Sequence, residues 1–211
     1  MTVVLATVGF HPEKVLPALR SHEDKEALVL FHDTDADGKS KRAARAARED
    51  ARRLGLEAEL VAVDAFDLVA TCLRLRREIR KRSAARREVV VSIAGGTRVL
   101  QAAALLAGVL EGVRVTHVNE RTNVAQSLPL LRLSAAEILS PKRRRVLLFV
   151  RDRPGCQARD IAQGLSLAKG TVSHHVRELR RRGLVEGEPD PDDSRSERLR
   201  AVPSAELLLA E

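Results

Sequence analysis

The stretch KGTVSHHVRELRRRGLV, residues 169–185, combines the pattern of an amphipathic helix with the start of a strand. Val172, Val176 and Leu179 recur at intervals of four and three residues, which places them on one face of a helix over Lys169–Arg182. Gly183 ends this helix, and the apolar residues after it begin an extended segment. We therefore expect three apolar side chains to be buried on one face and polar side chains to be exposed on the other.

A second helix is predicted just before this one, over Ala158–Gly164. The apolar residues that define its inner face recur at positions i, i+3, i+4 and i+7, and they are Ala158, Ile161, Ala162 and Leu165. Gly164 and Ser166 fall between the two helices, as a tight turn requires. Two crossing helices joined in this way form a helix-turn-helix.

A strand hairpin is predicted to follow, from Leu184–Glu188 and Glu197–Val202, with turn residues between them. A further helix, Pro141–Arg151, is predicted upstream. Together these elements make a winged helix-turn-helix domain, and residues 169–185 resemble the recognition-helix signature of winged-helix regulators of the ArsR and MarR type. This resemblance implies a protein that binds double-stranded DNA.

The outward face of the helix over Lys169–Arg182 carries small, hydrogen-bonding and cationic residues that could reach base edges and phosphates in a major groove. Gly170 lowers helix stability but would let the backbone approach DNA closely. His174 and His175 point about 100° apart on a helix, so we expect His174 to be exposed and His175 to pack inward. The candidate DNA-binding residues are Lys169, Gly170, Thr171, Ser173, His174 and Arg177, with Arg195 and Arg198 on the hairpin.

Positive charge is concentrated around this motif. Residues 142–182 hold 12 Lys or Arg and 3 Asp or Glu, a balance of +9, whereas the whole chain carries +8 with a pI of about 10.3. Such runs are either phosphate contacts or a solvated surface. The hairpin tip, Glu186 to Asp193, is acidic and would be repelled by phosphates, so it is not expected to enter the minor groove.

The first 130 residues alternate short apolar runs with longer helical patterns. Continuous aliphatic runs such as Val89-Val90-Val91 are typical of strands covered on both faces. The pattern predicts an α/β, Rossmann-like fold, a mostly parallel sheet flanked by helices. The predicted strands are Val3–Val8, Ala27–His32, Glu57–Val63, Glu88–Ile93 and Val113–Val118, with a further candidate at Gln126–Arg132, and the predicted helices are Pro12–Ser21, Lys39–Leu54, Ala65–Arg82 and Thr97–Glu111. The domains are expected to span residues 1–133 and 134–211.

Two glycine-containing loops follow predicted strands, Gly9-Phe10 after the first and Gly95-Gly96-Thr97-Arg98 after the fourth. In an open parallel sheet, ligands bind beyond the carboxyl ends of the strands at a switch point. Glycines there let backbone N–H groups approach phosphates, and the start of the next helix adds a partial positive charge. Taken alone, the Gly-Gly-Thr turn is equally compatible with a plain strand-to-helix connection.

The order of several short motifs extends this interpretation. Gly9-Phe10, a Val-Asp-x-Phe-Asp stretch at residues 63–67, the Gly-Gly-Thr-Arg turn and a C-terminal winged helix occur in that sequence. Together they resemble the CRISPR-associated Rossmann fold (CARF) regulators of archaeal type. The resemblance implies a homodimer that binds a cyclic oligoadenylate, usually cyclic tetra-adenylate, across its two-fold axis. It places the ligand-binding residues at Gly9, Phe10, His11, Ala94, Gly95, Gly96, Thr97 and Arg98, with Ala94 standing where the family commonly has a polar residue.

The sequence thus predicts a DNA-binding transcriptional regulator of CRISPR-Cas genes, acting as a homodimer on a roughly palindromic promoter. No catalytic residues and no resident cofactor are identified. Two alternatives remain: a ring nuclease that cleaves cyclic tetra-adenylate, and a repressor that senses another small metabolite or a metal. A ring nuclease would draw on Thr97, Arg98 or His11.

Cys72 and Cys156 match no metal-ligand spacing, so no metal site and no disulfide framework are expected. Unpaired thiols are typical of a reducing compartment. Residues 1–8 lack the pattern of a signal peptide, and the apolar segment Val99–Val115 is too short and too polar to span a bilayer. We therefore expect a cytoplasmic protein without a membrane partner.

Overall fold

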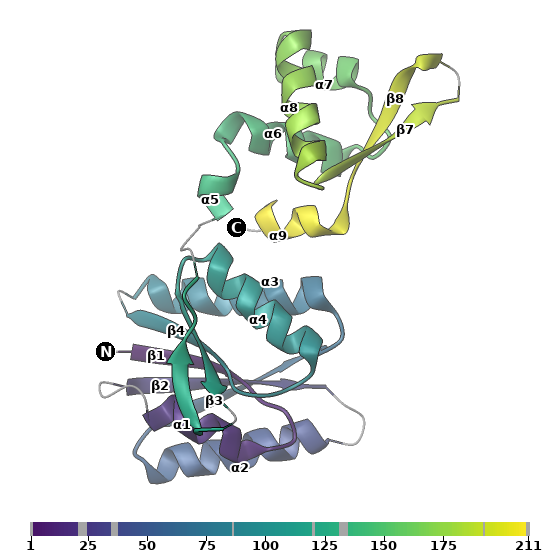
Figure 1. Cartoon of the computed structure of the whole chain (residues 1–211). Coiled ribbons are helices and arrows are strands. Elements are labelled where there is room, and N and C mark those ends of the chain that lie inside the picture. Colours follow the sequence, from purple (N-terminus) through teal and green to yellow (C-terminus); the bar gives the residue numbers. More distant parts are fainter. Residues whose placement is uncertain are drawn as a thin grey trace. The chain divides into compact units, whose positions relative to one another are not determined.

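The computed structural model describes residues 2–20, 25–34, 38–85, 87–119, 121–130, 135–191 and 193–209, and the side chains at 25, 135, 136, 194 and 195 are not described. The chain divides into two compact units, residues 1–134 and 135–211. Each unit has its own secondary structure and its own core (Figure 1). The two units are described separately.

The first unit is built on a six-stranded sheet with the strand order β3-β2-β1-β4-β5-β6. The first five strands in this order are parallel to their neighbours, and β6 runs antiparallel to β5. The order reverses at β1, because the chain first builds outward to β3 and then returns to place β4 on the other side of β1. The strands are β1 Thr2–Thr7, β2 Lys25–Asp33, β3 Glu57–Val63, β4 Glu88–Ile93, β5 Arg114–Asn119 and β6 Val124–Ser127.

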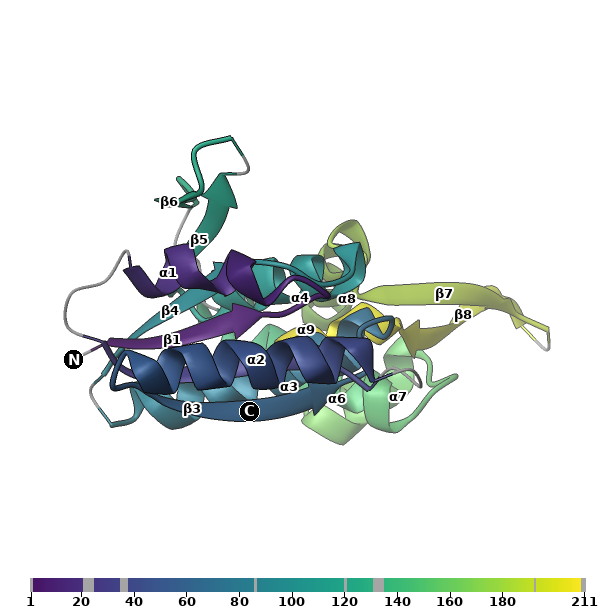
Figure 2. The same ribbon diagram turned by 90° about the horizontal axis from the view of Figure 1, so that it is seen from below.

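Helices cover both faces of this sheet (Figure 2). The 3-10 helix η1 (Pro12–Val15), α1 (Leu16–Arg20) and α2 (Lys39–Arg53) lie on one face, and α3 (Leu68–Ser83) and α4 (Arg98–Leu110) lie on the other. Every residue of β1 is buried, as expected for a strand covered from both sides. The prediction of a Rossmann-like, mostly parallel sheet flanked by helices is confirmed.

Several element boundaries differ from the sequence prediction, and two of the differences have a clear physical cause. Helix α3 begins at Leu68 and not at Ala65, because the Asp67 carboxylate accepts a hydrogen bond from the Ala70 N–H at 2.9 Å and caps the helix there. The sixth strand lies at Val124–Ser127, earlier than the predicted Gln126–Arg132, because it pairs with β5 as an antiparallel hairpin. Residues 131 and 132 of that prediction lie outside the described residues.

The second unit is the predicted winged helix-turn-helix, which is confirmed. Helices α7 and α8 form the helix-turn-helix, and β7 and β8 pair as an antiparallel hairpin. Ser166 turns the chain between α7 and α8 with a φ of 53°, in the left-handed region. The elements are α5 Ala135–Ile138, α6 Pro141–Asp152, α7 Ala158–Leu165, α8 Lys169–Arg181, β7 Val185–Asp190, β8 Asp193–Ala201, the 3-10 helix η2 Pro203–Ala205 and α9 Glu206–Leu209.

The core of the second unit is formed mainly by the inner faces of α6, α7 and α8. Ile161 on α7 and Val172 and Leu179 on α8 are fully buried, together with Val146 and Leu147 on α6. The hairpin contributes Leu199 to the same cluster. The fold of this unit therefore depends on the apolar stripe that the sequence predicts for α8.

Among the described residues, no helix is long and apolar enough to cross a membrane.

Candidate ligand pocket and nucleic-acid surface

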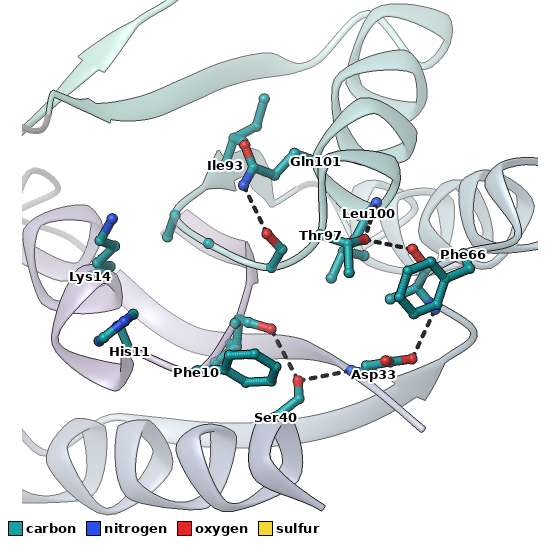
Figure 3. A pocket seen from close by; sticks show the side chains of 16 residues that line it. Phe10, His11, Lys14, Asp33, Ser40, Phe66, Ile93, Thr97, Leu100 and Gln101 are labelled. Atoms are coloured by element: carbon teal, nitrogen blue, oxygen red, sulfur yellow. Dashed lines mark hydrogen bonds between the residues drawn. The ribbon is translucent and has the colours of Figure 1, made fainter. Parts of the chain in front are cut away.

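A pocket of about 340 Å³ opens at the carboxyl ends of β1 and β4 (Figure 3). Its walls come from the loops that follow β1, β3 and β4, from the last residue of β2, from η1 and from the first turns of α2 and α4. This is the point at which the strand order reverses, where open parallel sheets bind their ligands. The pocket is therefore the candidate ligand site of the first unit.

Two glycine loops meet in this pocket, backbone against backbone. A Cβ atom on Gly9 would lie 2.6 Å from the backbone N of Gly96, and one on Gly95 would lie 3.1 Å from the backbone N of Gly9. Gly96 has a φ of 101°, and a Cβ there would lie 2.7 Å from Cδ2 of Leu100. A side chain at Gly9 would therefore push the two loops apart, and one at Gly95 would crowd the backbone of Gly9. Gly96 requires glycine because its positive φ strains any other residue.

Thr97 fixes the start of α4 beside the pocket. Its hydroxyl accepts a hydrogen bond from the Leu100 N–H at 3.0 Å and donates one to the Ala65 carbonyl at 2.6 Å. Gln101 Nε2 donates to the Gly96 carbonyl at 3.1 Å. The capped N-terminus of α4 thus adjoins the pocket, and its partial positive charge favours an anionic group there.

A chain of hydrogen bonds crosses the floor of the pocket. The Ser40 hydroxyl donates to the Val8 carbonyl at 3.2 Å and accepts from the Asp33 N–H at 3.0 Å. The Asp33 carboxylate in turn accepts from the Ala65 N–H at 3.0 Å. These bonds link the loop after β1 to the loop after β3 through the end of β2.

The pocket differs in charge from one end to the other. Lys14 and His11 lie at one end in Figure 3, and Asp33 lies at the other end, near Phe66. Glu13 pairs with His11 at 3.1 Å. The arrangement suits a ligand that carries anionic groups at one end and hydrogen-bond donors at the other.

Seven of the eight predicted ligand-binding residues line this pocket: Gly9, Phe10, His11, Ala94, Gly95, Gly96 and Thr97. Arg98 does not line it, because its side chain is exposed at the start of α4. The sequence analysis missed several lining residues, namely Val8, Lys14, Asp33, Ser40, Ala65, Phe66, Ile93, Leu100 and Gln101. Asp33 could have been found, because it stands directly after the predicted second strand, and Phe66 already stood in the Val-Asp-x-Phe-Asp stretch at residues 63–67.

The outward face of α8 is the candidate nucleic-acid surface. Val172 and Leu179 are fully buried and Val176 nearly so, whereas the opposite face is open. His174 is exposed and His175 is buried, as predicted. Of the predicted DNA-binding residues on this helix, Lys169, Gly170, Ser173, His174 and Arg177 are exposed and Thr171 is half-buried.

A groove of about 470 Å³ separates α8 from the hairpin. Ser173 and Arg177 line it from α8, and Gln157 and Ser196 line it from the neighbouring elements. Arg180 also lines this groove, where it pairs with Glu197 of β8 at 2.7 Å and so ties the hairpin to α8. The groove therefore presents Arg177 beside the hairpin on one continuous surface.

Two acidic residues of the hairpin are paired with its own arginines. Arg198 pairs with Asp190 at 3.1 Å, and Arg200 pairs with Glu188. Gln157 also donates to the buried Asp190 carboxylate. These pairs offset the negative charge of the hairpin but occupy Arg198, which was predicted to contact DNA. The side chain of Arg195, also predicted to contact DNA, lies outside those the structure describes.

His175 makes the second unit sensitive to acid. Among the described residues, neither ring nitrogen has a hydrogen-bond partner, and burial lowers the pKa of the imidazole. The nearby cations Arg143 and Lys142 of α6, and His174, lower this pKa further. The pKa of His175 in the folded state lies below its value of about 6.5 in the unfolded chain. The folded state therefore has its full stability from this residue above pH 6.5, where the imidazole is neutral in both states.

We expect the free energy of unfolding of the second unit to fall as the pH drops from about 6.5 through the folded-state pKa of His175. His175→Leu should remove this dependence, because a leucine fills the site without a titrating group. Urea unfolding followed by circular dichroism at pH 7.5 and 5.5 measures it, with the exposed His174→Leu as the matched control. Equal pH dependence in the wild type and His175→Leu would refute this role.

Neither cysteine is poised for chemistry. Burial raises the pKa of the Cys72 thiol to about 11, and it also raises the pKa of Cys156. Thiols in this state are poor nucleophiles. Across the described parts of the chain, no group of three or more His, Cys, Asp or Glu side chains is placed to hold a metal ion.

Comparison with protein families matches each unit separately. The family model for the Csa3 CRISPR-associated Rossmann-like domain matches residues 2–127, and the model for the MarR family matches residues 139–196. These matches confirm the resemblance to CRISPR-associated Rossmann-fold regulators and to MarR-type winged helices. No curated protein is similar enough to count as a relative.

Solved structures with local similarity include MarR, a MarR-family transcription regulator and other transcriptional regulators. They include the PcaV transcriptional regulator of Streptomyces coelicolor with its natural ligand (27% identity, 35% of this chain and 53% of that chain, TM-score 0.33). The MepR–DNA complex of S. aureus matches at 25% identity over 34% of this chain and 53% of that chain, with a TM-score of 0.32. The complex of Streptococcus pneumoniae FabT with DNA matches at 20% identity over 35% of this chain and 51% of that chain, with a TM-score of 0.33. The chain spans about half the length of these regulators.

Proposed function

The chain belongs to the family of the Csa3 CRISPR-associated Rossmann-like domain, and we propose that it is a regulator whose affinity for promoter DNA responds to a cyclic oligoadenylate. The MarR-family winged helix in the same chain supports a transcriptional regulator. The regulated genes would be those of a CRISPR-Cas system. The ligand would bind at the glycine loops of the first unit, and DNA would bind at α8 of the second.

The observation that carries the DNA-binding proposal is the two-sided character of α8. Its apolar stripe completes the core, while Lys169, Ser173 and Arg177 are exposed along the opposite face. A helix of this kind can enter the major groove, with Arg177 directed at a guanine edge and Lys169 at a phosphate. Two copies of the chain would read two half-sites about one helical turn apart, so the operator would be roughly palindromic.

The size and chemistry of the pocket support a shared nucleotide ligand. A volume of about 340 Å³ lies near the lower end for small-molecule sites, which run from about 300 to 1,000 Å³. It offers room for a nucleotide-sized group and not for a four-nucleotide ring. A cyclic tetra-adenylate would therefore span the pockets of two copies in a homodimer. Its phosphates would lie against the glycine loops, the N-terminus of α4 and Lys14.

The ligand would act through a difference in its affinity for two arrangements of the dimer. A ligand that binds both arrangements equally shifts nothing, however tightly it binds. Coupling free energies between two sites are typically about 1–3 kcal/mol, which corresponds to a change of about 5- to 150-fold in DNA affinity.

Calorimetry of the full chain with cyclic tetra-adenylate, AMP and divalent metal ions tests the ligand proposal. We expect cyclic tetra-adenylate to bind with one ring per two chains and to be recovered intact. Failure of cyclic oligoadenylates of every ring size to bind would overturn the ligand assignment, and binding of a metal ion or AMP in their place would favour a metabolite or metal sensor. Rapid appearance of linear products would instead identify a ring nuclease.

Gly170 provides a test of DNA contact that separates function from stability. A Cβ atom at this exposed position in the first turn of α8 would meet nothing within 4 Å. Gly170→Ala should therefore raise the free energy of unfolding by about 0.5–1 kcal/mol, because alanine favours the helix. It should also weaken DNA binding, because the methyl group would stand between the helix backbone and the duplex. A variant that is both more stable and equally tight on DNA would show that the backbone does not approach DNA here.

A further inference from the structure

We propose that Phe66, facing the same pocket as Phe10, is a stacking platform for a nucleobase, and that Asp33 beside it selects a base with an exocyclic amino group. This inference rests on the proposed function, since it names the contacts that hold the bases of the oligoadenylate. The glycine loops would contact the phosphate backbone of such a ligand. Phe66 and Asp33 would add the recognition of the base.

The first argument is the unusual use of aromatic residues. The chain contains four Phe and no Trp or Tyr. Phe31 and Phe149 are buried in the two units, whereas Phe10 is 65% exposed and Phe66 is 72% exposed. Both exposed rings line the same pocket. Exposed aromatic rings gathered at one pocket indicate a binding surface, because neither contributes its area to a core.

The second argument is the rigidity of the loop that presents Phe66. The Phe66 N–H donates to the Asp64 carboxylate at 2.9 Å, and Asp67 caps α3 directly afterwards. Ala65 is fully buried and held on both sides, its N–H by Asp33 and its carbonyl by Thr97. A loop anchored at these points fixes the backbone that presents the ring before any ligand arrives, which lowers the entropic cost of binding.

The third argument is the position of Asp33. Hydrogen bonds run from Val8 through Ser40 and Asp33 to Ala65, so they connect the segment before Phe10 with the segment before Phe66 (Figure 3). The Asp33 carboxylate already accepts the Ala65 N–H, and a carboxylate has further lone pairs for a second donor. The amino group at the 6-position of adenine supplies such a donor, whereas the carbonyl at the same position of hypoxanthine would be repelled. The same carboxylate disfavours a phosphate beside it, so the phosphates would lie towards the glycine loops and Lys14.

Fluorescence offers a direct test, because the chain lacks Trp and Tyr and a single introduced tryptophan is the sole strong emitter. In full-length Phe66→Trp, titration with cyclic tetra-adenylate should quench and shift the emission as the base stacks on the indole. Leu54→Trp is the matched control, since Leu54 is an exposed apolar residue of the same unit, 56% exposed, that does not line the pocket. Its emission should not change.

Calorimetry provides the second measurement. Phe66→Ala should bind cyclic tetra-adenylate about 5- to 150-fold more weakly than the wild type, which is the loss expected for one base stack. Phe66→Tyr should keep most of the wild-type affinity, because its ring can still stack. Asp33→Asn should lower the ratio of the affinity for cyclic tetra-adenylate to the affinity for its inosine analogue, which carries a carbonyl in place of the amino group. Because Phe66 is exposed, Phe66→Ala should unfold at the same temperature as the wild type.

The outcomes separate this inference from the function on which it rests. If the wild type binds cyclic tetra-adenylate while Phe66→Ala binds equally well and Phe66→Trp is not quenched, the stacking platform is refuted and the proposed ligand stands. If the wild type does not bind, the proposed ligand fails and the platform with it. If Phe66→Ala dissociates into monomers in sedimentation velocity, Phe66 is a contact between two copies, and the platform is again refuted.

Discussion

Replacing Gly9 with valine is expected to abolish binding of cyclic tetra-adenylate, with a loss of affinity of about 100-fold or more. A Cβ atom at this position would lie 2.6 Å from the backbone N of Gly96 and 3.1 Å from its Cα. Backbone atoms cannot move aside as a flexible side chain can, so the two glycine loops must separate. Displacing the groups of a site by about 1 Å can lower its efficiency by about 100-fold.

The same substitution should destabilise the first unit by about 1–3 kcal/mol, the usual cost of overpacking. Calorimetry and thermal unfolding measure the two effects. Gly112→Asn is the matched control, because Gly112 lies in the same unit with a φ of 65° and an open surrounding, and asparagine tolerates that conformation. Ligand-free DNA affinity should remain within about twofold of the wild type. Loss of DNA affinity as well would mean that the two functions are not divided between the two units.

Replacing Arg177 with alanine is expected to weaken specific DNA binding by about 1–3 kcal/mol, or about 5- to 150-fold, if the guanidinium reads a guanine edge. Arg177 is exposed on α8 and lines the groove beside the hairpin. Fluorescence anisotropy at a fixed salt concentration measures the change. Arg53→Ala is the matched control, because Arg53 is an exposed arginine of α2 that pairs with Asp50 at 3.0 Å.

The salt dependence distinguishes two roles for Arg177. If Arg177 contacts a base, its removal should relax the sequence preference at one position of the site. If it contacts a phosphate, its removal should weaken binding to all sequences alike and lower the slope of log affinity against log salt concentration by about one. Unchanged affinity at fixed salt would contradict either role and would move the DNA-binding surface away from the outward face of α8.

The fold could be predicted from sequence where burial dictates the residue pattern. The aliphatic run at 89–91 indicates a strand covered on both faces, and β4 is such a strand in the structure. The repeat of Val172, Val176 and Leu179 likewise predicts the face of α8 that joins the core. In both elements the apolar pattern follows directly from the packing, so the sequence is sufficient.

Elements set by pairing or by short contacts were harder to predict. Strand β6 is exposed over most of its length, so it carries no buried pattern, and its place is decided by its pairing with β5. Helices α5 and α9 have four residues each, fewer than a periodic pattern needs. Helix α3 begins late because a single aspartate caps it.

The candidate site was predictable in part. Glycine loops after the first and fourth strands are visible in the sequence, because their residue types are demanded by backbone contact. Asp33 was not assigned to the site, and Phe66 was noted only as part of the Val-Asp-x-Phe-Asp stretch, because their role depends on the strand order, which brings the ends of β1, β2, β3 and β4 to one pocket. The periodicity of the sequence predicts strands but does not order them, so residues that gather by topology stay hidden.

We propose that one chain couples an oligoadenylate pocket to a DNA-reading helix. The most direct measurement is the affinity of the full chain for a duplex selected from a random pool, with and without saturating cyclic tetra-adenylate. We predict that the selected duplexes are roughly palindromic and that the ligand changes their affinity by about 5- to 150-fold in the wild type, and not in Gly9→Val. Equal DNA affinity with and without bound ligand, or no selected sequence at all, would contradict the account.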